Sequence, residues 1–192
     1  MKHPLLLMSL PALLALPIYL LLWPVDLEPV AWSPQPAPSL EAEPYLPNQR
    51  LMAVQRLADG ALSGPESVAI DAQGHLHSGL EDGRIVRIDP RDGRCTVLAD
   101  TGGRPLGLQF MADGRLAVAD ARKGLLSVGK DGRITVLAER ADGVQLGFAD
   151  DVDVDAQGQI YFSDASWKFG YGEHTLDALE HGARGRLLRW QP

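Results

Sequence analysis

Two carboxylates, Glu66 and Asp150, are the residues of this sequence whose type and spacing best fit metal chemistry. Each stands eight residues before a glycine, Gly74 or Gly158, in two stretches of similar sequence. If the fold turns both side chains toward one point, they repel each other unless a cation or protons lie between them. Carboxylate oxygens from separate parts of a chain suit Ca²⁺, which accepts irregular sets of six to eight oxygens. The spacing therefore predicts a calcium site with Glu66 and Asp150 as ligands.

An alternative places both carboxylates at solvated junctions between loops and strands, where acidic residues are common and bind nothing. A second calcium motif is excluded. Asp151, Asp153 and Asp155 imitate the start of an EF-hand loop, but Ala156 and Phe162 stand where such a loop needs glycine and glutamate. Alternation along a strand explains the three aspartates better.

An internal repeat predicts the elements that must position these carboxylates. The turn glycines Gly74, Gly114 and Gly158 are 40 and then 44 residues apart. A second landmark, residues 92–99, returns as residues 131–138 at a spacing of 39. A period of about 40 residues indicates a repeat architecture.

Each repeat contains four short strands joined by glycine-containing turns, at 67–70, 76–79, 85–89 and 95–98 in the first unit. Four-stranded antiparallel units of this length are typical of the blades of a β-propeller, whose innermost strands line a central channel. The sequence thus predicts an all-β propeller. Counting eight residues back from the glycine of the second repeat adds Leu106 to the ring of channel positions.

The third repeat ends early in this sequence, because residues 185–192 match only residues 83–90 of the first. A closed ring needs roughly 4 to 8 blades, so we expect an incomplete propeller and a truncated form of a longer protein. The predicted organisation is a signal anchor over 1–25, a proline-rich spacer over 26–50 and a partial propeller over 51–192.

The N-terminal head predicts a single transmembrane helix. Residues 5–23 carry no charge over 19 positions, about enough to cross a bilayer. Bulky residues fill the place of a signal-peptidase site, so we expect an uncleaved anchor with the N-terminus in the cytoplasm and the body on the exported side. A cleaved signal peptide is the alternative. Since the whole chain has a net charge of −7, nucleic acid is excluded as a partner.

Other polar residues carry weaker signals. His75 and His77 flank Leu76 on a strand, and we expect them on an outward polar face without a role. Within an insertion over 167–182, Thr175 as N-cap and Gly182 beyond the end predict a short helix. The inserted aromatic residues are expected either to form a lid over a pocket or to pack as a plain loop.

Three motifs resemble a known family: residues 64–69, residues 103–108, and residues 148–151 together with 160–166. They are similar to the strictosidine synthase-like proteins, including the adipocyte plasma membrane-associated type, within the gluconolactonase and paraoxonase superfamily. The resemblance extends from about residue 50 to the end. It implies a six-bladed propeller of which this sequence holds the first half.

The resemblance also implies a channel calcium ion, held by a glutamate at the position of Glu66 and an asparagine at the position of Asp150. Paraoxonases carry a catalytic histidine at the position of Leu106, and leucine cannot act as a general base. Strictosidine synthases use a glutamate from a late blade, which this sequence lacks. Synthase chemistry is therefore not expected, and no catalytic residue is assigned.

The predicted function is a membrane-anchored, calcium-dependent hydrolase of lactones or esters, in which the metal polarises a carbonyl group of a small-molecule substrate. The lipid bilayer is the other expected partner, through the N-terminal helix. The alternative is a non-catalytic, membrane-tethered binding or scaffold propeller with structural calcium, since one fold hosts many roles.

Overall fold

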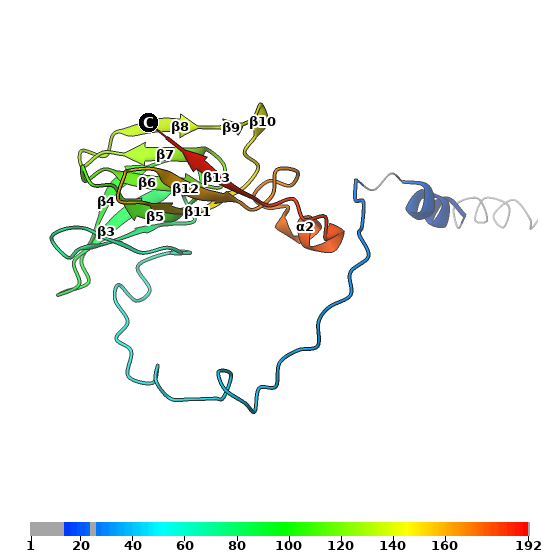
Figure 1. Ribbon diagram of the computed structural model, residues 1–192, viewed down its shortest axis with the longest axis horizontal. Helices are drawn as coiled ribbons and strands as arrows, with labels where there is room; N and C mark the ends of the chain where they lie inside the picture. Colours follow the sequence, from blue (N-terminus) through cyan, green and yellow to red (C-terminus); the bar gives the residue numbers. More distant parts are fainter. Residues whose placement is uncertain (1–13, 24–25, 192) are drawn as a thin grey trace, which may run out of the picture.

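The computed structural model describes residues 14–23 and 26–191, and its strands form successive antiparallel sheets (Figure 1). The first two sheets have four strands each, in sequence order. The strands of the first are β1 (Ala69–Ile70), β2 (Leu76–Gly79), β3 (Arg84–Ile88) and β4 (Cys95–Asp100). The strands of the second are β5 (Pro105–Phe110), β6 (Leu116–Asp120), β7 (Gly124–Val128) and β8 (Ile134–Ala138). These are the two predicted blades.

The third blade has three strands within the described residues, β11 (Ala149–Val154), β12 (Ile160–Asp164) and β13 (Arg186–Trp190). Helix α2 (His174–Glu180) lies in the insertion between β12 and β13. A small ribbon of β9 (Arg140–Ala141) and β10 (Val144–Gln145) connects the second blade to the third. The predicted all-β architecture of repeated sheets is confirmed.

One turn recurs in all three blades and shows why the glycines mark the repeat. Gly74, Gly114 and Gly158 have φ of 83°, 81° and 81°, a left-handed conformation that favours glycine. In each turn the glycine N–H donates to the carbonyl three residues earlier, at distances of 2.9, 2.9 and 3.0 Å. The turn therefore joins the innermost strand of each blade to the second strand with the same geometry.

The hydrophobic core lies between neighbouring blades, and the second blade is buried on both faces. On β6, Leu116 and Val118 pack toward the first blade, whereas Ala117 and Ala119 pack toward the third. Alternate residues of a strand point to opposite faces of its sheet. This explains why β6 is an unbroken apolar run until Asp120.

Two glycines allow the blades to come close near the channel. A Cβ on Gly79 would collide with the backbone of Pro105, and a Cβ on Gly107 would lie 2.6 Å from the Cα of Asp151. In both cases the obstacle is backbone, which cannot move aside as a flexible side chain can. Glycine at 79 and 107 therefore sets the distance between consecutive blades.

The N-terminal segment differs from the blades. Residues 14–22 are helical, while most of the predicted anchor, residues 1–13 and 24–25, lies outside the described residues. In the part of the chain that the structure describes, no helix has the length and apolarity needed to cross a membrane. Residues 26–68 contain no helix or strand and run as a long arc from the neighbourhood of α2 to the first blade (Figure 1).

Gly107→Ala is expected to destabilise the protein by about 1–3 kcal/mol, the usual cost of overpacking a rigid contact. Gly170→Ala is the matched control, because its φ is ordinary and its added Cβ would meet only contacts of 3.7 Å or longer. Chemical denaturation of the two variants and the wild type measures the difference. Equal loss of stability in both variants would contradict the proposed role of Gly107 in blade spacing.

Candidate functional site

The three channel positions counted from the repeat meet in one cleft of about 280 Å³. Glu66 lies just before β1, whereas Leu106 and Asp150 are the second residues of β5 and β11. Ser67, Gly107 and Asp151 complete the lining. The sequence repeat therefore brings together two carboxylates that are 84 positions apart.

A buried aspartate positions the cleft residue of the second and third blades. Asp120 and Asp164, the last residues of β6 and β12, are both fully buried. Asp120 accepts a hydrogen bond from the backbone N–H of Arg104 at 2.9 Å, two residues before Leu106. Asp164 accepts one from the N–H of Phe148 at 2.7 Å, again two residues before the cleft residue. The same contact thus sets the start of both innermost strands.

The first blade uses a different contact, because Leu80 occupies the place of these aspartates. There, the guanidinium of Arg104 donates to the backbone carbonyl of Gly64 at 2.8 Å, two residues before Glu66. Arg104 is only 8% exposed. A residue of the second blade therefore positions the carboxylate of the first.

The electrostatics of the cleft disfavour two negative charges. Burial raises the pKa of Glu66, and the charge of Asp150 raises it further, while Arg104 opposes both effects. Burial also raises the pKa of Asp150, with the charge of Asp151 adding to it. No hydrogen-bond donor contributes to either shift. Each carboxylate is thus short of a positive partner, which a cation could supply.

The carboxylate oxygens of the cleft are ligands of the type that calcium prefers, but they are too few for a complete site. Glu66 and Asp150 offer hard oxygen ligands in one cleft, whereas Ca²⁺ takes six to eight. Over residues 14–23 and 26–191 no group of three or more His, Cys, Asp or Glu side chains is arranged to hold a metal. The ligand roles of Glu66 and Asp150 therefore stay a prediction.

The insertion of the third blade forms the predicted helix with a different N-cap. Helix α2 begins at His174, so Thr175 lies inside it, and Glu173 occupies the N-cap position without a side-chain cap. At the other end His181, not Gly182, adopts the left-handed conformation, with φ of 54°. The predicted N-cap is therefore wrong, whereas Gly182 lies beyond the end of the helix as predicted. Tertiary contacts hold this end, since the carboxylate of Glu180 lies between Lys168 and Arg184.

The inserted aromatic residues do not line the cleft, and Trp167 is exposed. Phe169 is buried. Tyr171 meets Phe148 edge to face, with ring centroids 5.6 Å apart, and Arg122 lies 5.1 Å from its ring centroid. These contacts favour plain loop packing over a lid.

At the opposite end of the innermost strands, the expectation of an outward polar face is wrong for His77. Its side chain is 4% exposed, and its Nε2 lies 3.2 Å from a carboxylate oxygen of Asp71. Its ring meets Phe110 of the second blade edge to face at 5.0 Å. The second blade covers this face of β2, which the alternation of one strand cannot reveal. The sequence held one signal of this burial: Ala117, the residue of the second repeat at the position of His77, is apolar. In the structure Ala117 is fully buried.

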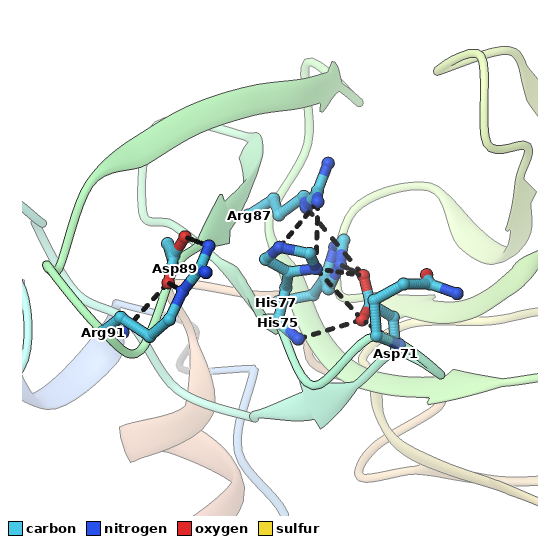
Figure 2. Close-up of polar contacts among 7 residues, drawn as sticks. Asp71, His75, His77, Arg87, Asp89 and Arg91 are labelled. Atoms are coloured by element: carbon cyan, nitrogen blue, oxygen red, sulfur yellow. Dashed lines mark hydrogen bonds and ion pairs between the residues drawn. The ribbon is translucent and has the colours of Figure 1, made fainter.

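Asp71 is the centre of this cluster (Figure 2). It accepts hydrogen bonds from the backbone N–H groups of Gln73 and His75 at 2.9 Å each, and the His75 ring lies 3.1 Å away. Partial burial opposes ionisation, but the hydrogen bonds from His75 and His77 outweigh it and lower the pKa of Asp71 to about 2. Asp71 is therefore charged at neutral pH.

Comparison with known proteins identifies relatives of this chain. Residues 43–88 match the family model described as strictosidine synthase-like, N-terminal. The strictosidine synthase-like 6 protein of Arabidopsis thaliana is 38% identical over 156 residues, which cover 78% of this chain and 42% of that protein. The adipocyte plasma membrane-associated protein of Mus musculus is 34% identical over 160 residues, covering 75% and 38%. The chain thus spans about two fifths of the length of these relatives.

Solved structures agree with the fold. A gluconolactonase from Xanthomonas campestris matches with a TM-score of 0.50 and 27% identity over 54% of this chain and 36% of its own. A putative gluconolactonase matches with a TM-score of 0.56 and 19% identity over 72% and 48%, a likeness that concerns the fold alone. The resemblance expected from the three sequence motifs is confirmed.

Asp164→Asn is expected to lower the free energy of unfolding by about 3 kcal/mol, because it leaves the partly buried Arg186 without its charged partner. Arg189→Gln, an exposed change on the neighbouring strand β13, is the control and should stay within about 0.5 kcal/mol of wild type. Urea denaturation measures both. An Asp164→Asn variant that is as stable as the wild type would show that this aspartate does not hold the third blade.

Asp71→Asn is expected to destabilise the protein by about 2 kcal/mol at neutral pH, through loss of charge-assisted hydrogen bonds. Because folding lowers the pKa of Asp71 to about 2, its contribution is complete above the unfolded pKa of about 4 and is lost as the pH falls toward 2. Denaturant unfolding of both proteins between pH 7 and 2 should show the wild-type advantage shrinking below pH 4. An advantage that grows with acid would contradict this assignment.

Proposed function

We propose that this chain, which belongs to the strictosidine synthase-like proteins, supplies the first blades of a membrane-anchored, calcium-dependent propeller hydrolase of lactones or esters. The likeness to gluconolactonases supports a hydrolase-like propeller. Because the chain spans about two fifths of its curated relatives, activity and substrate belong to the proposal.

One observation carries the proposal: Glu66 and Asp150, from separate blades, face one cleft at the channel end of the strands. Partial burial and neighbouring negative charge raise the pKa of both carboxylates, although Glu66 is exposed and Asp150 half-buried. Such an arrangement is costly unless a cation neutralises it. A fold that positions both carboxylates by buried polar contacts is therefore suited to holding a cation.

In this proposal, each residue of the cleft and its supporting contacts has a separate role. Glu66 and Asp150 bind the ion, which when present would polarise a carbonyl oxygen of the substrate. Asp120 and Asp164 hold the starts of β5 and β11 in place, so that the cleft is formed before substrate arrives. Leu106 is 4% exposed and gives the cleft an apolar side.

A second candidate is a non-catalytic binding propeller with structural calcium. Leu106 favours it, because leucine cannot act as a general base in the cleft. The residues that line the cleft include no histidine, lysine or cysteine, so carboxylates are their sole titratable groups. The two candidates differ in whether a general base lies beside the ion. Hydrolysis of a panel of lactones and aryl esters in calcium, abolished by a chelator, supports the hydrolase, whereas calcium binding without turnover supports the binding protein.

Membrane attachment is the second part of the proposal. It rests on the uncharged run over residues 5–23 and on relatives that are named plasma membrane-associated. The proposed topology is single-pass, with the propeller on the exported side, as the charge distribution at the head predicts.

Glu66→Gln is expected to weaken calcium binding about tenfold or more, because it removes a charged ligand from a site with few of them. Calcium at about 100 times its dissociation constant should stabilise the wild type by about 2.7 kcal/mol. At the same calcium concentration, the variant should lose about half of that stabilisation or more, while melting like wild type in chelator. Calorimetric titration and thermal melts with and without calcium provide the measurements.

Glu139→Gln is the matched control, since Glu139 is exposed and lies outside the cleft. It should bind calcium like wild type. A wild-type protein that binds no calcium, or a Glu66→Gln variant that binds it equally well, would return both carboxylates to the role of solvated junction residues.

A further inference from the structure

Four large apolar side chains lie exposed around helix α2 of the third blade, and none of them lines the cleft. Each is between 42% and 67% exposed, and we call them the α2 patch: Leu179 on the helix, Trp167 in the insertion before it, and Val30 and Trp32 in the segment that precedes the blades. Exposed apolar side chains that gather in one place mark surfaces that dock on a protein or a membrane.

Contacts at the end of α2 bring the members of the patch together from distant parts of the chain. The backbone N–H of Val30 donates to the carbonyl of Glu180, the residue after Leu179, at 2.8 Å. Two residues further on, the ring of Trp32 packs against that of His181, with centroids 4.7 Å apart. The segment before the blades therefore lies along the end of the helix and adds its apolar side chains to the same surface.

The charged side chains at the centre of the patch pair with one another. The buried carboxylate of Glu180 lies 2.7 Å from Lys168 and 3.0 Å from Arg184. Glu28 lies 3.7 and 3.5 Å from the same two cations. The guanidinium of Arg184 also lies 5.1 Å from the ring centroid of Trp167. Since two positive and two negative charges balance here, apolar contact is what the patch offers to a partner.

The chain itself holds the patch close to the proposed anchor. Seven positions separate Trp23, the last residue of the uncharged run, from Val30. A chain of that length spans at most about 25 Å, which is less than the ~30 Å thickness of the hydrocarbon core of a bilayer. If residues 5–23 cross the membrane, the patch therefore stays near its surface.

The composition of the patch suits the surface of a bilayer. A tryptophan ring is largely apolar but carries one N–H donor, and tryptophan is enriched where the hydrocarbon core meets the lipid headgroups. Two of the four tryptophans of the chain belong to the patch, and a third, Trp23, ends the uncharged run. A zwitterionic lipid surface thus fits both the chemistry and the position of the patch.

We propose that the α2 patch rests on the bilayer surface as a second membrane contact, with its tryptophan rings and Leu179 among the headgroups. This inference rests on the proposed membrane attachment, because the anchor keeps the patch near the lipid. It also assigns the face that the protein turns toward the membrane. The insertion begins after Asp164, which pairs with Ala149 beside Asp150. The contact therefore turns the cleft end of the third blade toward the bilayer.

Two single-tryptophan forms of the whole 192-residue protein, reconstituted into phosphatidylcholine vesicles, test the proposal. One form keeps Trp167 and the other keeps Trp190, with phenylalanine at the remaining three tryptophan positions. Trp190 is the reference, because it lies at the opposite end of β13 from the insertion. Phosphatidylcholine brominated near the headgroup quenches tryptophan at short range. It should remove most of the Trp167 fluorescence and little of the Trp190 fluorescence.

One variant and its control locate the contact. Leu179→Glu places a charge in the patch and should lower the ratio of docked to undocked protein about tenfold or more, and with it the quenching of Trp167. Val97→Glu is the matched control, because Val97 is an exposed aliphatic residue of β4, across the blades from α2 (Figure 1). It should leave the quenching unchanged. Because Trp190 is partly buried, a form that keeps both Trp167 and Trp190 carries the same comparison if the threefold replacement fails to fold.

Alkaline carbonate extraction of the same vesicles tests the anchor separately. Protein that resists extraction while Trp167 and Trp190 are quenched alike overturns the proposal and leaves the anchor in place. Protein that is extracted, although lipid had quenched Trp167, supports the patch and contradicts the anchor. Equal effects of Leu179→Glu and Val97→Glu overturn the proposal. So does a Leu179→Glu variant that is quenched like wild type but converts a dimer in detergent to a monomer, since the patch then pairs two copies of the chain.

Discussion

A fully buried carboxylate at the end of the second strand is the contact on which the cleft depends. Asp120 and Asp164 are each 0% exposed and accept backbone N–H groups from the segment that enters the innermost strand. Buried backbone donors must be paired, and a charged acceptor pairs several of them at once. Asp120 also accepts from the N–H groups of Arg122 and Lys123 and the hydroxyl of Thr101. Removing it would release the entry to β5 and the turn between β6 and β7 together.

The same strands carry chemistry at both ends. At one end Glu66 and Asp150 share a cleft in which negative charge has too few partners. At the other, the carboxylate of Asp71 lies 3.1 Å from the ring of His75 and 3.2 Å from that of His77. Rigidly packed blades separate these two ends, because glycine at 79 and at 107 brings the backbones of neighbouring blades into contact.

The segment before the blades is tied to the third blade. The N–H of Val30 donates to the carbonyl of Glu180 at 2.8 Å, and Glu28 lies 3.7 Å from Lys168 and 3.5 Å from Arg184. The hydrogen bond from Lys168 contributes most to holding the pKa of Glu180 low, at about 2. The chain that leaves the N-terminal head thus meets the body at helix α2, over a hundred residues away in sequence.

Periodicity in the sequence determined the blades, the recurring turn and the meeting of Glu66, Leu106 and Asp150, because identical local patterns build identical hairpins. Three short motifs carried the family resemblance. Tertiary structure alone decided what lies between blades. Whether His77 faces solvent or a neighbour, where α2 ends, and which carbonyl Arg104 binds all depend on segments distant in the chain. A strand's alternation separates its two faces but does not say what covers each, and that packing set the burial, and so the chemistry, of His77.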